Sequence, residues 1–261
     1  MKLSIDVGNS QIYAGLFDGD ELVSRFRKIT QRGASSDELG VFFRQAVREN
    51  GNDPAGIDAV GFCSVVPDLN HSMINACRRY FDVEPFVLRA GVKTGLKIRY
   101  KNPAEVGADR IAGAVGAVER YPGRNILIID FGTATTVEAV SSSREYLGGA
   151  IVPGLGISMK ALEQNTARLP KVEIVRPRKA CGRSTVESIQ SGLYWGHVGL
   201  IREIRNRIGL ECFGASEPVV VGTGGFAGLL ADTGLFNDIH PDLVLEGISI
   251  AQEMNKQESR T

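Results

Sequence analysis

The feature that most constrains the fold is a short pattern that occurs twice, nearly half a chain apart. Ile5-Asp6-Val7-Gly8-Asn9-Ser10 and Ile129-Asp130-Phe131-Gly132-Thr133-Ala134 each place an aspartate at the end of an apolar run, followed by a glycine and a polar turn. The offset is 130 minus 6, or 124 residues, in a chain of 261. A repeat at that distance predicts two related halves that begin alike.

Each copy of the pattern opens a predicted β-meander, a run of three short antiparallel strands. The first meander is expected at about 2–6, 11–17 and 21–28, and the second at 125–130, 135–140 and 145–147. Between them, helices at 36–49, 69–80 and 107–121 alternate with strands at 59–64 and 85–88. We therefore expect a duplicated α/β fold with mixed sheets flanked by helices, divided into halves at 1–120 and 121–261.

The second half continues with fewer strands. After a Gly/Pro segment at 148–156 come a helix that ends near 165, a long helix at 185–208, a strand at 218–221, the start of a helix at 226–230 and a final helix at 243–256. The first helix of the chain is expected to be capped by Ser36. Residues 257–261 are predicted to fray.

Composition excludes several classes of function. The chain has 30 Lys and Arg residues and 30 Asp and Glu residues, so no excess of basic residues favours binding to nucleic acid or to an anionic membrane. The chain shows neither an export signal nor a membrane span, and its four scattered cysteines are expected to be reduced thiols, so we expect a cytoplasmic protein. Its three histidines lie too far apart in sequence for an obvious zinc or iron site.

The two aspartate turns are the strongest candidates for phosphate binding. No Walker loop occurs in the chain, which excludes a simple P-loop enzyme. A glycine turn lets backbone N–H groups approach phosphate oxygens, while the aspartate at the strand end reaches a cation. A single such turn is better interpreted as an ordinary hairpin. Two turns at equivalent places favour the functional interpretation, in which they grip a triphosphate from opposite sides of a cleft.

A glycine-rich segment, Gly222-Thr223-Gly224-Gly225-Phe226-Ala227, also fits a dinucleotide-binding pattern. Too little chain follows it for the remaining strands of a Rossmann domain. A tight strand-to-helix turn is the preferred interpretation. A backbone ledge against which an adenosine lies is the alternative.

A third candidate is Gly107-Ala108-Asp109-Arg110, at the start of a predicted helix. An acidic residue in the first turn of a helix is expected from the helix dipole alone. However, a carboxylate is the natural acceptor for a hydroxyl proton in a chain so poor in histidine, and a loose phosphoryl-transfer transition state needs little base strength. Both interpretations of Asp109 stay open on the sequence.

Taken together, the motifs resemble the type III pantothenate kinase family. The resemblance rests on Asp6 to Ser10, Cys63-Ser64-Val65-Val66-Pro67, Thr94-Gly95-Leu96, Ile98-Arg99-Tyr100, Glu105 to Arg110, Asp130 to Thr136, Tyr146 to Gly154, Thr185 to Gly192 and Thr223-Gly224-Gly225. These motifs occur in family order over nearly the whole chain, and their joint occurrence is specific although each alone is weak.

The resemblance implies a homodimeric enzyme with a duplicated actin-like ATPase fold, in which each half is ribonuclease-H-like. It implies transfer of the ATP γ-phosphoryl group to the primary hydroxyl of pantothenate, the first step of coenzyme A synthesis, with Mg²⁺ and a monovalent cation, K⁺ or NH₄⁺. Neither nucleic acid nor membrane is an expected partner. In a regulatory alternative the chain is an actin-like ATP-binding accessory factor, and in another it is an actin-like kinase for a different small hydroxylated substrate.

The resemblance also assigns roles to individual residues. The nucleotide loop falls on Asp6, Val7, Gly8, Asn9, Ser10, Gln11, Ile12 and Tyr13, with Thr133 a further nucleotide contact. Pantothenate contacts fall on Tyr100, Gly107, Ala108, Asp109, Arg110 and Thr185, and Arg110 is the expected partner of the substrate carboxylate. The proton acceptor falls on Asp109 and the monovalent-cation ligand on Asp130. The argument from the phosphate turns adds a divalent-metal contact at Asp6.

Three positions depart from the family pattern. Glu138 stands where aspartate is common, so cation preference is less certain than nucleotide binding. Lys97 and Lys101 replace a common proline and a common aspartate, and both are expected at the surface. In the predicted long helix, Gly192, Gly196 and Gly199 form a line of small residues that allows another helix to approach, within the chain or from a second subunit.

Overall fold

The computed structural model of the chain describes residues 1–256, and the expected frayed end at 257–261 lies outside them. The described chain divides into two compact units. Unit 1 contains Met1–Leu96, Lys101–Gly116 and the chain from Asp242 onward, and unit 2 contains Lys97–Tyr100 and Ala117–Pro241. The last helix is therefore part of the first unit by its packing, whereas the boundary between repeated halves near residue 120 stays a prediction.

Unit 1 is built on a five-stranded sheet with the order β3-β2-β1-β4-β5. Its strands are β1 (Lys2–Val7), β2 (Gln11–Asp18), β3 (Glu21–Ile29), β4 (Ala59–Ser64) and β5 (Phe86–Val87). The first three form the predicted antiparallel meander, while β4 runs parallel to β1 and β5 parallel to β4. Parallel neighbours bring the carboxyl ends of β1 and β4 to the same edge.

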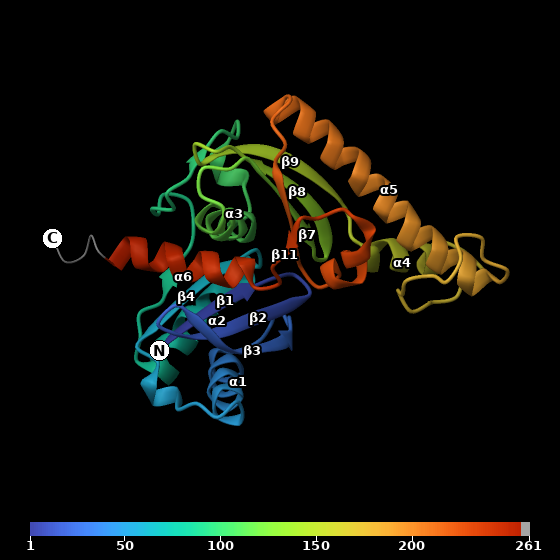
Figure 1. Cartoon of the computed structure of the whole chain (residues 1–261). Helices are drawn as coiled ribbons and strands as arrows, with labels where there is room; N and C mark the ends of the chain where they lie inside the picture. Colours follow the sequence, from blue (N-terminus) through green and yellow to red (C-terminus); the bar gives the residue numbers. More distant parts are fainter. Residues whose placement is uncertain (257–261) are drawn as a thin grey trace. The chain divides into compact units, whose positions relative to one another are not determined.

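Helices cover both faces of this sheet. α1 (Ser36–Glu49) and α2 (Pro67–Phe81) pack their apolar residues against one face, and α6 (Leu243–Lys256) lies on the other face against β1 and β4 (Figure 1). The cap of α1 is Ser35 and not Ser36, because the Ser35 hydroxyl accepts the Glu38 N–H while Glu38 accepts the Ser35 N–H.

Glycines allow α6 to pack closely against α3 (Ala108–Arg120), whose first two turns belong to unit 1. A Cβ on Gly247 would lie 1.8 Å from the Ala112 carbonyl oxygen, and one on Gly116 would lie 2.5 Å from the Leu243 carbonyl oxygen. Larger side chains there would separate the two helices. α3 begins at the Gly107–Arg110 motif, as the sequence predicts, so its position fixes Asp109.

Unit 2 repeats the same sheet. Its strands are β6 (Lys97–Ile98), β7 (Ile126–Phe131), β8 (Ala134–Val140), β9 (Glu145–Pro153), β10 (Val219–Thr223) and β11 (Asp238–Ile239), in the order β11-β10-β7-β8-β9-β6. Apart from β6, this is the order of the first sheet, with β7–β11 in place of β1–β5. As in unit 1, the second strand pairs antiparallel and the fourth pairs parallel with the first.

The register of the two sheets is equivalent at the aspartates. Asp6 stands beside Cys63 of its parallel neighbour, and Asp130 stands beside Thr223 of its own. The duplicated α/β fold predicted from the sequence repeat is confirmed by this match of order, direction and register. β6 and β11, at two residues each, are too short to leave a periodic signal and were not predicted.

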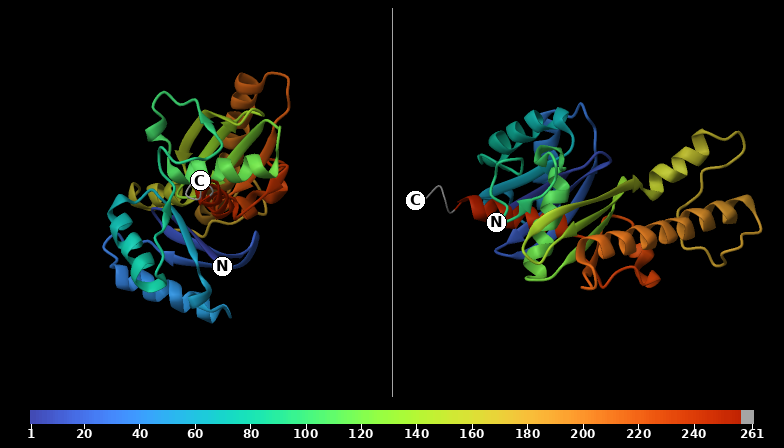
Figure 2. Two further views of the ribbon diagram at one scale, coloured as in Figure 1. Left: turned by 90° about the vertical axis from the view of Figure 1, so that its left-hand side faces the viewer. Right: turned by 90° about the horizontal axis from the view of Figure 1, so that it is seen from above.

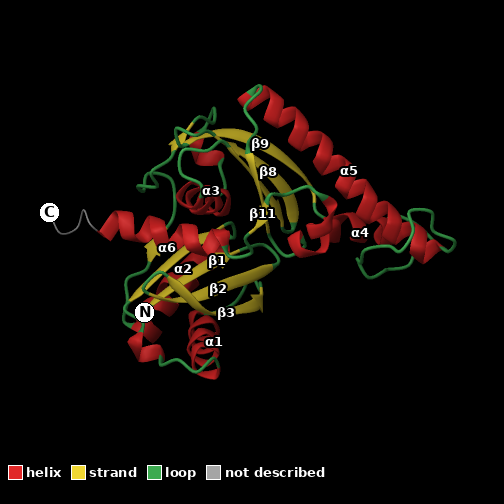
Figure 3. Cartoon of the chain, in the orientation of Figure 1, coloured by secondary structure: helices red, strands yellow, loops and turns green. Residues whose placement is uncertain are grey.

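The long helix α5 (Thr185–Phe213) packs on the six-stranded sheet of unit 2, where Tyr194, Val198 and Ile201 join the core. It runs five residues beyond its predicted end and stops before Gly214, which has φ +59°. The start of α5 and the helix α4 (Leu155–Gln164) extend together beyond the sheet (Figure 2). Residues 165–184 connect them without helix or strand (Figure 3).

Two local predictions were wrong. The Gly/Pro segment at 148–156 is in its first part a strand, since β9 continues to Pro153. Gly149 is required there by close packing, because a Cβ would lie 1.9 Å from the Val137 carbonyl oxygen. The helix predicted from 226 is a 3₁₀ helix, Ala227–Thr233. No helix among residues 1–256 combines the length and the apolar character needed to span a bilayer.

Candidate functional site

The turn that follows β1, residues 8–11, is narrow and anchored, and we call it the Asp6 turn. The Gly8 N–H donates to the Gln11 carbonyl at 3.1 Å, and a Cβ on Gly8 would lie 2.9 Å from that oxygen. Thr30 holds the turn from the end of β3, because its hydroxyl donates to the Gly8 carbonyl at 2.6 Å and its N–H donates to the Ser10 carbonyl at 3.1 Å. Asn9, Ser10 and Gln11 are exposed on this fixed backbone.

Asp6 stands at the base of this turn, half-buried and in an electrostatically unfavourable place. The Cys63 thiol donates to Asp6 Oδ1 at 3.4 Å. Burial, followed by the nearby Asp109 carboxylate, raises the pKa of Asp6 to about 7, and the Cys63 hydrogen bond opposes this rise. Burial, followed by Asp6, also raises the pKa of Cys63, so the sulfur keeps its proton and acts as a donor.

Asp109 is held by the start of α3. The Arg110 N–H donates to Asp109 Oδ1 at 2.7 Å. A Cβ on Gly107 would lie 2.4 Å from the same oxygen, so only glycine leaves room for this carboxylate. Burial raises the pKa of Asp109, while the backbone and the guanidinium of Arg110 lower it. Asp6 and Asp109 are far apart in sequence, but within unit 1 the Asp109 carboxylate lies close enough to contribute to the raised pKa of Asp6.

The remaining residues of the predicted nucleotide segment differ in what they present. Val7 and Ile12 are buried in the core of unit 1, so only their backbone is available to a ligand. The Tyr13 hydroxyl donates to Asp242, which also forms an ion pair with Arg25 at 2.8 Å. The guanidinium of Arg27 lies 3.9 Å from the centre of the Tyr13 ring. Tyr13 is therefore fixed by protein partners.

In unit 2, the equivalent turn at residues 132–134, the Asp130 turn, is enclosed by two glycines. A Cβ on Gly224, which has φ +86°, would lie 2.2 Å from Asp130 Oδ1 and 2.7 Å from the Phe131 nitrogen. A Cβ on Gly154 would lie 2.3 Å from the Thr133 carbonyl oxygen. The Gly222–Ala227 segment thus forms a tight turn after β10 that packs against Asp130. A tight turn after a strand is the interpretation that the sequence analysis preferred.

The other predicted residues of unit 2 lie at separate places. Tyr100 follows β6, and its ring lies 3.7 Å from where a Cβ on Gly148 would stand. Glu138 is 2% exposed on β8, opposite Ile128 of β7, which puts it on the same face of the sheet as Asp130. Lys97, expected at the surface, is exposed and pairs with Glu145 at 3.6 Å, and Lys101 is exposed too.

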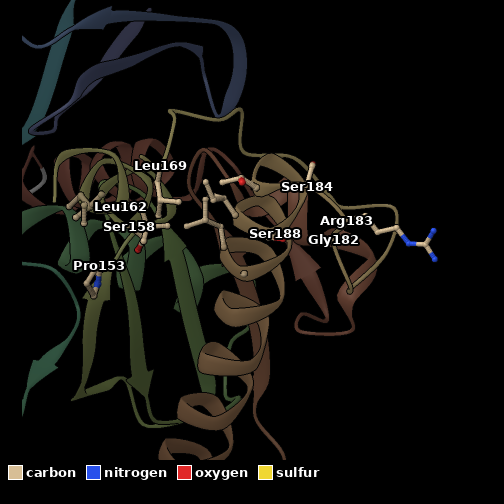
Figure 4. A pocket seen from close by; sticks show the side chains of 14 residues that line it. Pro153, Ser158, Leu162, Leu169, Gly182, Arg183, Ser184 and Ser188 are labelled. Atoms are coloured by element: carbon tan, nitrogen blue, oxygen red, sulfur yellow. The ribbon is translucent and has the colours of Figure 1, made fainter. Parts of the chain in front are cut away.

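Thr185 lines a cavity of about 1110 Å³ between α4 and the start of α5. The walls are mostly apolar, with Ile157, Leu162, Leu169 and Ile189 among them, and Ser158, Ser184 and Ser188 supply hydroxyl groups (Figure 4). Arg183 lies at the rim, and its side chain points away from the cavity (Figure 4).

Sequence reasoning missed three residues that contact the predicted site. Cys63 belongs to a motif that was noticed, but its pairing with Asp6 depends on a parallel strand 57 residues away. Gly224 was noticed as part of a turn, and its contact with Asp130 was not. His197, which contacts Thr135 beside the Asp130 turn at 3.0 Å, left no signal, since a single histidine in a helix has no recognisable pattern.

Comparison with known proteins gives one consistent result. The family model for type III pantothenate kinase matches residues 2–207. The chain is 52% identical over 255 residues to a type III pantothenate kinase of Legionella pneumophila (strain Paris), an alignment that covers 98% of this chain and 99% of the relative.

Solved structures share the fold at low sequence identity. A conserved putative Baf family transcriptional activator from Campylobacter jejuni matches with a TM-score of 0.62 and 19% identity, over 98% of this chain and 99% of the other. A putative 2-dehydro-3-deoxygalactonokinase from Sinorhizobium meliloti matches with a TM-score of 0.57 and 11% identity, over 98% and 99% of the two chains. At such identities the likeness shows the fold alone.

Proposed function

The chain belongs to the type III pantothenate kinase family, and we propose from this premise that it transfers the γ-phosphoryl group of ATP to the primary hydroxyl of pantothenate. The products are ADP and 4′-phosphopantothenate, and the reaction is the first step of coenzyme A synthesis. The observation that carries the proposal within the structure is that unit 1 brings the carboxylates of Asp6 and Asp109 near each other, beside the turn that follows β1. It offers one carboxylate for the metal–phosphate region and one for the acceptor hydroxyl.

Asp109 is the proposed proton acceptor. The hydroxyl oxygen of pantothenate forms a bond to the γ-phosphorus, the bond from that phosphorus to the β–γ bridging oxygen breaks, and the hydroxyl proton passes to Asp109. Burial raises the pKa of Asp109, which makes it a better proton acceptor than an exposed aspartate. The close fit against Gly107 and the hydrogen bond from the Arg110 N–H hold the carboxylate in one position.

The polar groups around Asp6 and Asp130 fit the cations that such a reaction uses. Mg²⁺ prefers oxygen ligands, and a divalent ion beside Asp6 would offset the repulsion between the Asp6 and Asp109 carboxylates. When bound with ATP, such an ion would neutralise charge that develops on the phosphates. Asp130 is the proposed ligand of a monovalent cation, K⁺ or NH₄⁺, with the buried Glu138 on the same sheet face.

Nucleotide and substrate contacts are assigned by the family motifs. The nucleotide is proposed to contact Asp6, the Asp6 turn and Thr133, with backbone N–H groups as donors. Pantothenate is proposed to contact Tyr100, Gly107, Ala108, Arg110 and Thr185. Arg110 supplies a guanidinium for the carboxylate of pantothenate. The apolar cavity at Thr185 supplies walls of the kind that the methyl groups of pantothenate need.

The same family motifs support a homodimer through α5. Gly192, Gly196 and Gly199 have open space where a Cβ would stand, so no part of the described chain packs closely on this line. Trp195 is 41% exposed and Leu200 is 39% exposed on the same helix. Exposed large apolar groups beside small residues are typical of a helix that packs against a partner, and we propose a second copy as that partner.

The proposed reaction is tested by identifying the product. Purified protein with Mg²⁺, K⁺ and ATP is incubated with pantothenate, and the phosphorylated product is measured by mass spectrometry. A sugar, which other actin-like kinases phosphorylate, is the parallel acceptor. We expect a mass increase for pantothenate alone. Phosphorylation of the sugar in its place would assign the protein to the alternative kinase activity.

A further inference from the structure

His197 is a buried side chain of α5 that the proposed function does not use. It lies on the face of α5 that packs against the sheet of unit 2, one residue from Val198 and four from Ile201, both of which are in the core. His197 is 6% exposed, whereas histidine is a residue of only intermediate average burial.

The contacts of His197 fall on both ends of the Asp130 turn. Phe131 and Thr135 stand opposite each other and close the turn from β7 and β8. The Thr135 hydroxyl and His197 Nε2 lie 3.0 Å apart in a hydrogen bond, and the rings of Phe131 and His197 are 5.8 Å apart between centres. A single helical side chain therefore touches the strand that enters the turn and the strand that leaves it.

Burial makes these contacts specific. Phe131 and Thr135 are each 1% exposed, so their polar and aromatic partners come from the protein. Burial lowers the pKa of His197, which keeps the ring neutral near pH 7 and leaves Nε2 able to form the hydrogen bond with the Thr135 hydroxyl. A buried hydroxyl that loses its partner costs more than the bond itself contributes, so the bond strongly disfavours other positions of Thr135.

We propose that His197 is a positioning residue that fixes the Asp130 turn in the conformation that receives the nucleotide, through its hydrogen bond to Thr135 and its contact with Phe131. Gly224 packs against the same turn, where a Cβ would lie 2.2 Å from Asp130 Oδ1. The turn is thus held between β10 and α5. Because α5 also begins at Thr185, the same helix positions a nucleotide turn and a proposed substrate contact.

The inference rests on the proposed function, so the experiment measures nucleotide binding separately from turnover. Binding of MgATP without pantothenate is measured by isothermal titration calorimetry for wild-type protein, His197→Leu, His197→Gln, Thr135→Val and the double variant His197→Leu/Thr135→Val. Ile201→Val, which removes a methylene from the same core and leaves both contacts of His197 in place, is the control for general loss of packing. Melting temperatures and KM values for ATP and pantothenate are measured in parallel.

We expect His197→Leu and Thr135→Val each to raise the Kd and KM for ATP by about fivefold to tenfold, the effect of losing one buried hydrogen bond. The double variant should be no weaker than the weaker single variant, because both changes remove the same bond. Gln at 197 has an amide that reaches the position of Nε2 and should restore most of the affinity. Ile201→Val should lower the melting temperature and leave the Kd unchanged.

Three outcomes would overturn the inference. The first is a His197→Leu protein that binds ATP like the wild type. The second is a loss of ATP affinity in Ile201→Val as large as that in His197→Leu, in two variants with the same melting temperature. That result would mean that His197 contributes only to packing. The third, wild-type protein that binds no nucleotide, would overturn the proposed function together with this inference. Wild-type protein that binds ATP but does not phosphorylate pantothenate would overturn the proposed function only.

Discussion

At the scale of single residues, Asp109 distinguishes a catalytic carboxylate from a helix-capping one. Asp109→Asn keeps the size of the side chain and removes the base, so we expect kcat to fall by about 10²- to 10⁴-fold with little change in the Kd for ATP. If Asp109 only stabilises the start of the helix, Asp109→Asn should lower the free energy of unfolding by at most about 1 kcal/mol and leave turnover nearly normal. Turnover and melting temperature of the same variant separate the two interpretations.

The raised pKa of Asp6 predicts a pH dependence of stability in the absence of nucleotide and metal. The carboxyl group titrates at about 7 in the folded chain and at its ordinary value of 3.8 when unfolded, so the folded chain holds the proton more tightly. Between these values the free energy of unfolding must fall as the pH rises, by about 1.4 kcal/mol for each unit of pKa difference. Asp6→Asn removes this contribution.

Urea unfolding of wild-type protein and Asp6→Asn at pH 5 and pH 8 measures this effect. We expect the variant to gain stability relative to the wild type as the pH rises. A difference between the two proteins that stays constant over this range would contradict the assignment of a raised pKa to Asp6.

Candidate site residues could be proposed from the sequence where a local pattern marks them. Asp6 and Asp130 were recognised because each ends an apolar strand before a glycine turn, and Asp109 because it starts a helix. Cys63 and His197 could not be found in this way, since their contacts depend on strand register and on helix packing over 57 and 62 residues. Such contacts have no periodicity in the sequence.

At the scale of elements, the contact of α3 with α6 depends on Gly247 more than on Gly113. In Gly247→Ala the new Cβ would lie 1.8 Å from the Ala112 carbonyl oxygen, and we expect a loss of about 3 kcal/mol in the free energy of unfolding. Gly113→Ala, whose Cβ meets its nearest neighbour at 3.9 Å, is the matched control. It should be neutral or stabilising by up to about 1 kcal/mol.

Denaturant unfolding of both variants tests this prediction. Equal destabilisation by the two alanines would contradict the prediction, because, of these two glycines, only Gly247 lies against the backbone of the facing helix.

Sequence reasoning predicted the elements whose apolar residues follow one period, such as the two meanders and α1. It ended β9 too early because Gly148 and Gly149 are typical of turns, whereas Gly149 serves the close approach to β8. It ended α5 five residues before Phe213, where the helix carries mostly exposed residues and little periodic signal remains.

At the scale of the whole molecule, the proposed dimer predicts that a charged side chain on the glycine line of α5 leaves the folded subunit intact and weakens the association of two subunits. Gly196→Glu finds open space within the chain, so the fold and melting temperature of a single subunit should be retained. At an intersubunit face the buried charge should weaken association. Analytical ultracentrifugation at micromolar concentration should show a dimer for the wild type and a larger monomer fraction for the variant.

Arg207→Glu is the control for the ultracentrifugation, because it changes the charge of α5 at a side chain that is 77% exposed and belongs to another part of the helix. It should remain dimeric. A fully active wild-type monomer would contradict the dimer proposal.

The central claim, that this actin-like chain is a pantothenate kinase with Asp109 as its base, is tested most directly by ADP formation in a coupled assay. Wild-type protein with ATP, Mg²⁺ and K⁺ should release ADP only when pantothenate is added, and slower when Na⁺ replaces K⁺. Asp109→Asn should lose this pantothenate-dependent rate. The absence of pantothenate-dependent ADP formation by folded, ATP-binding wild-type protein would contradict the account.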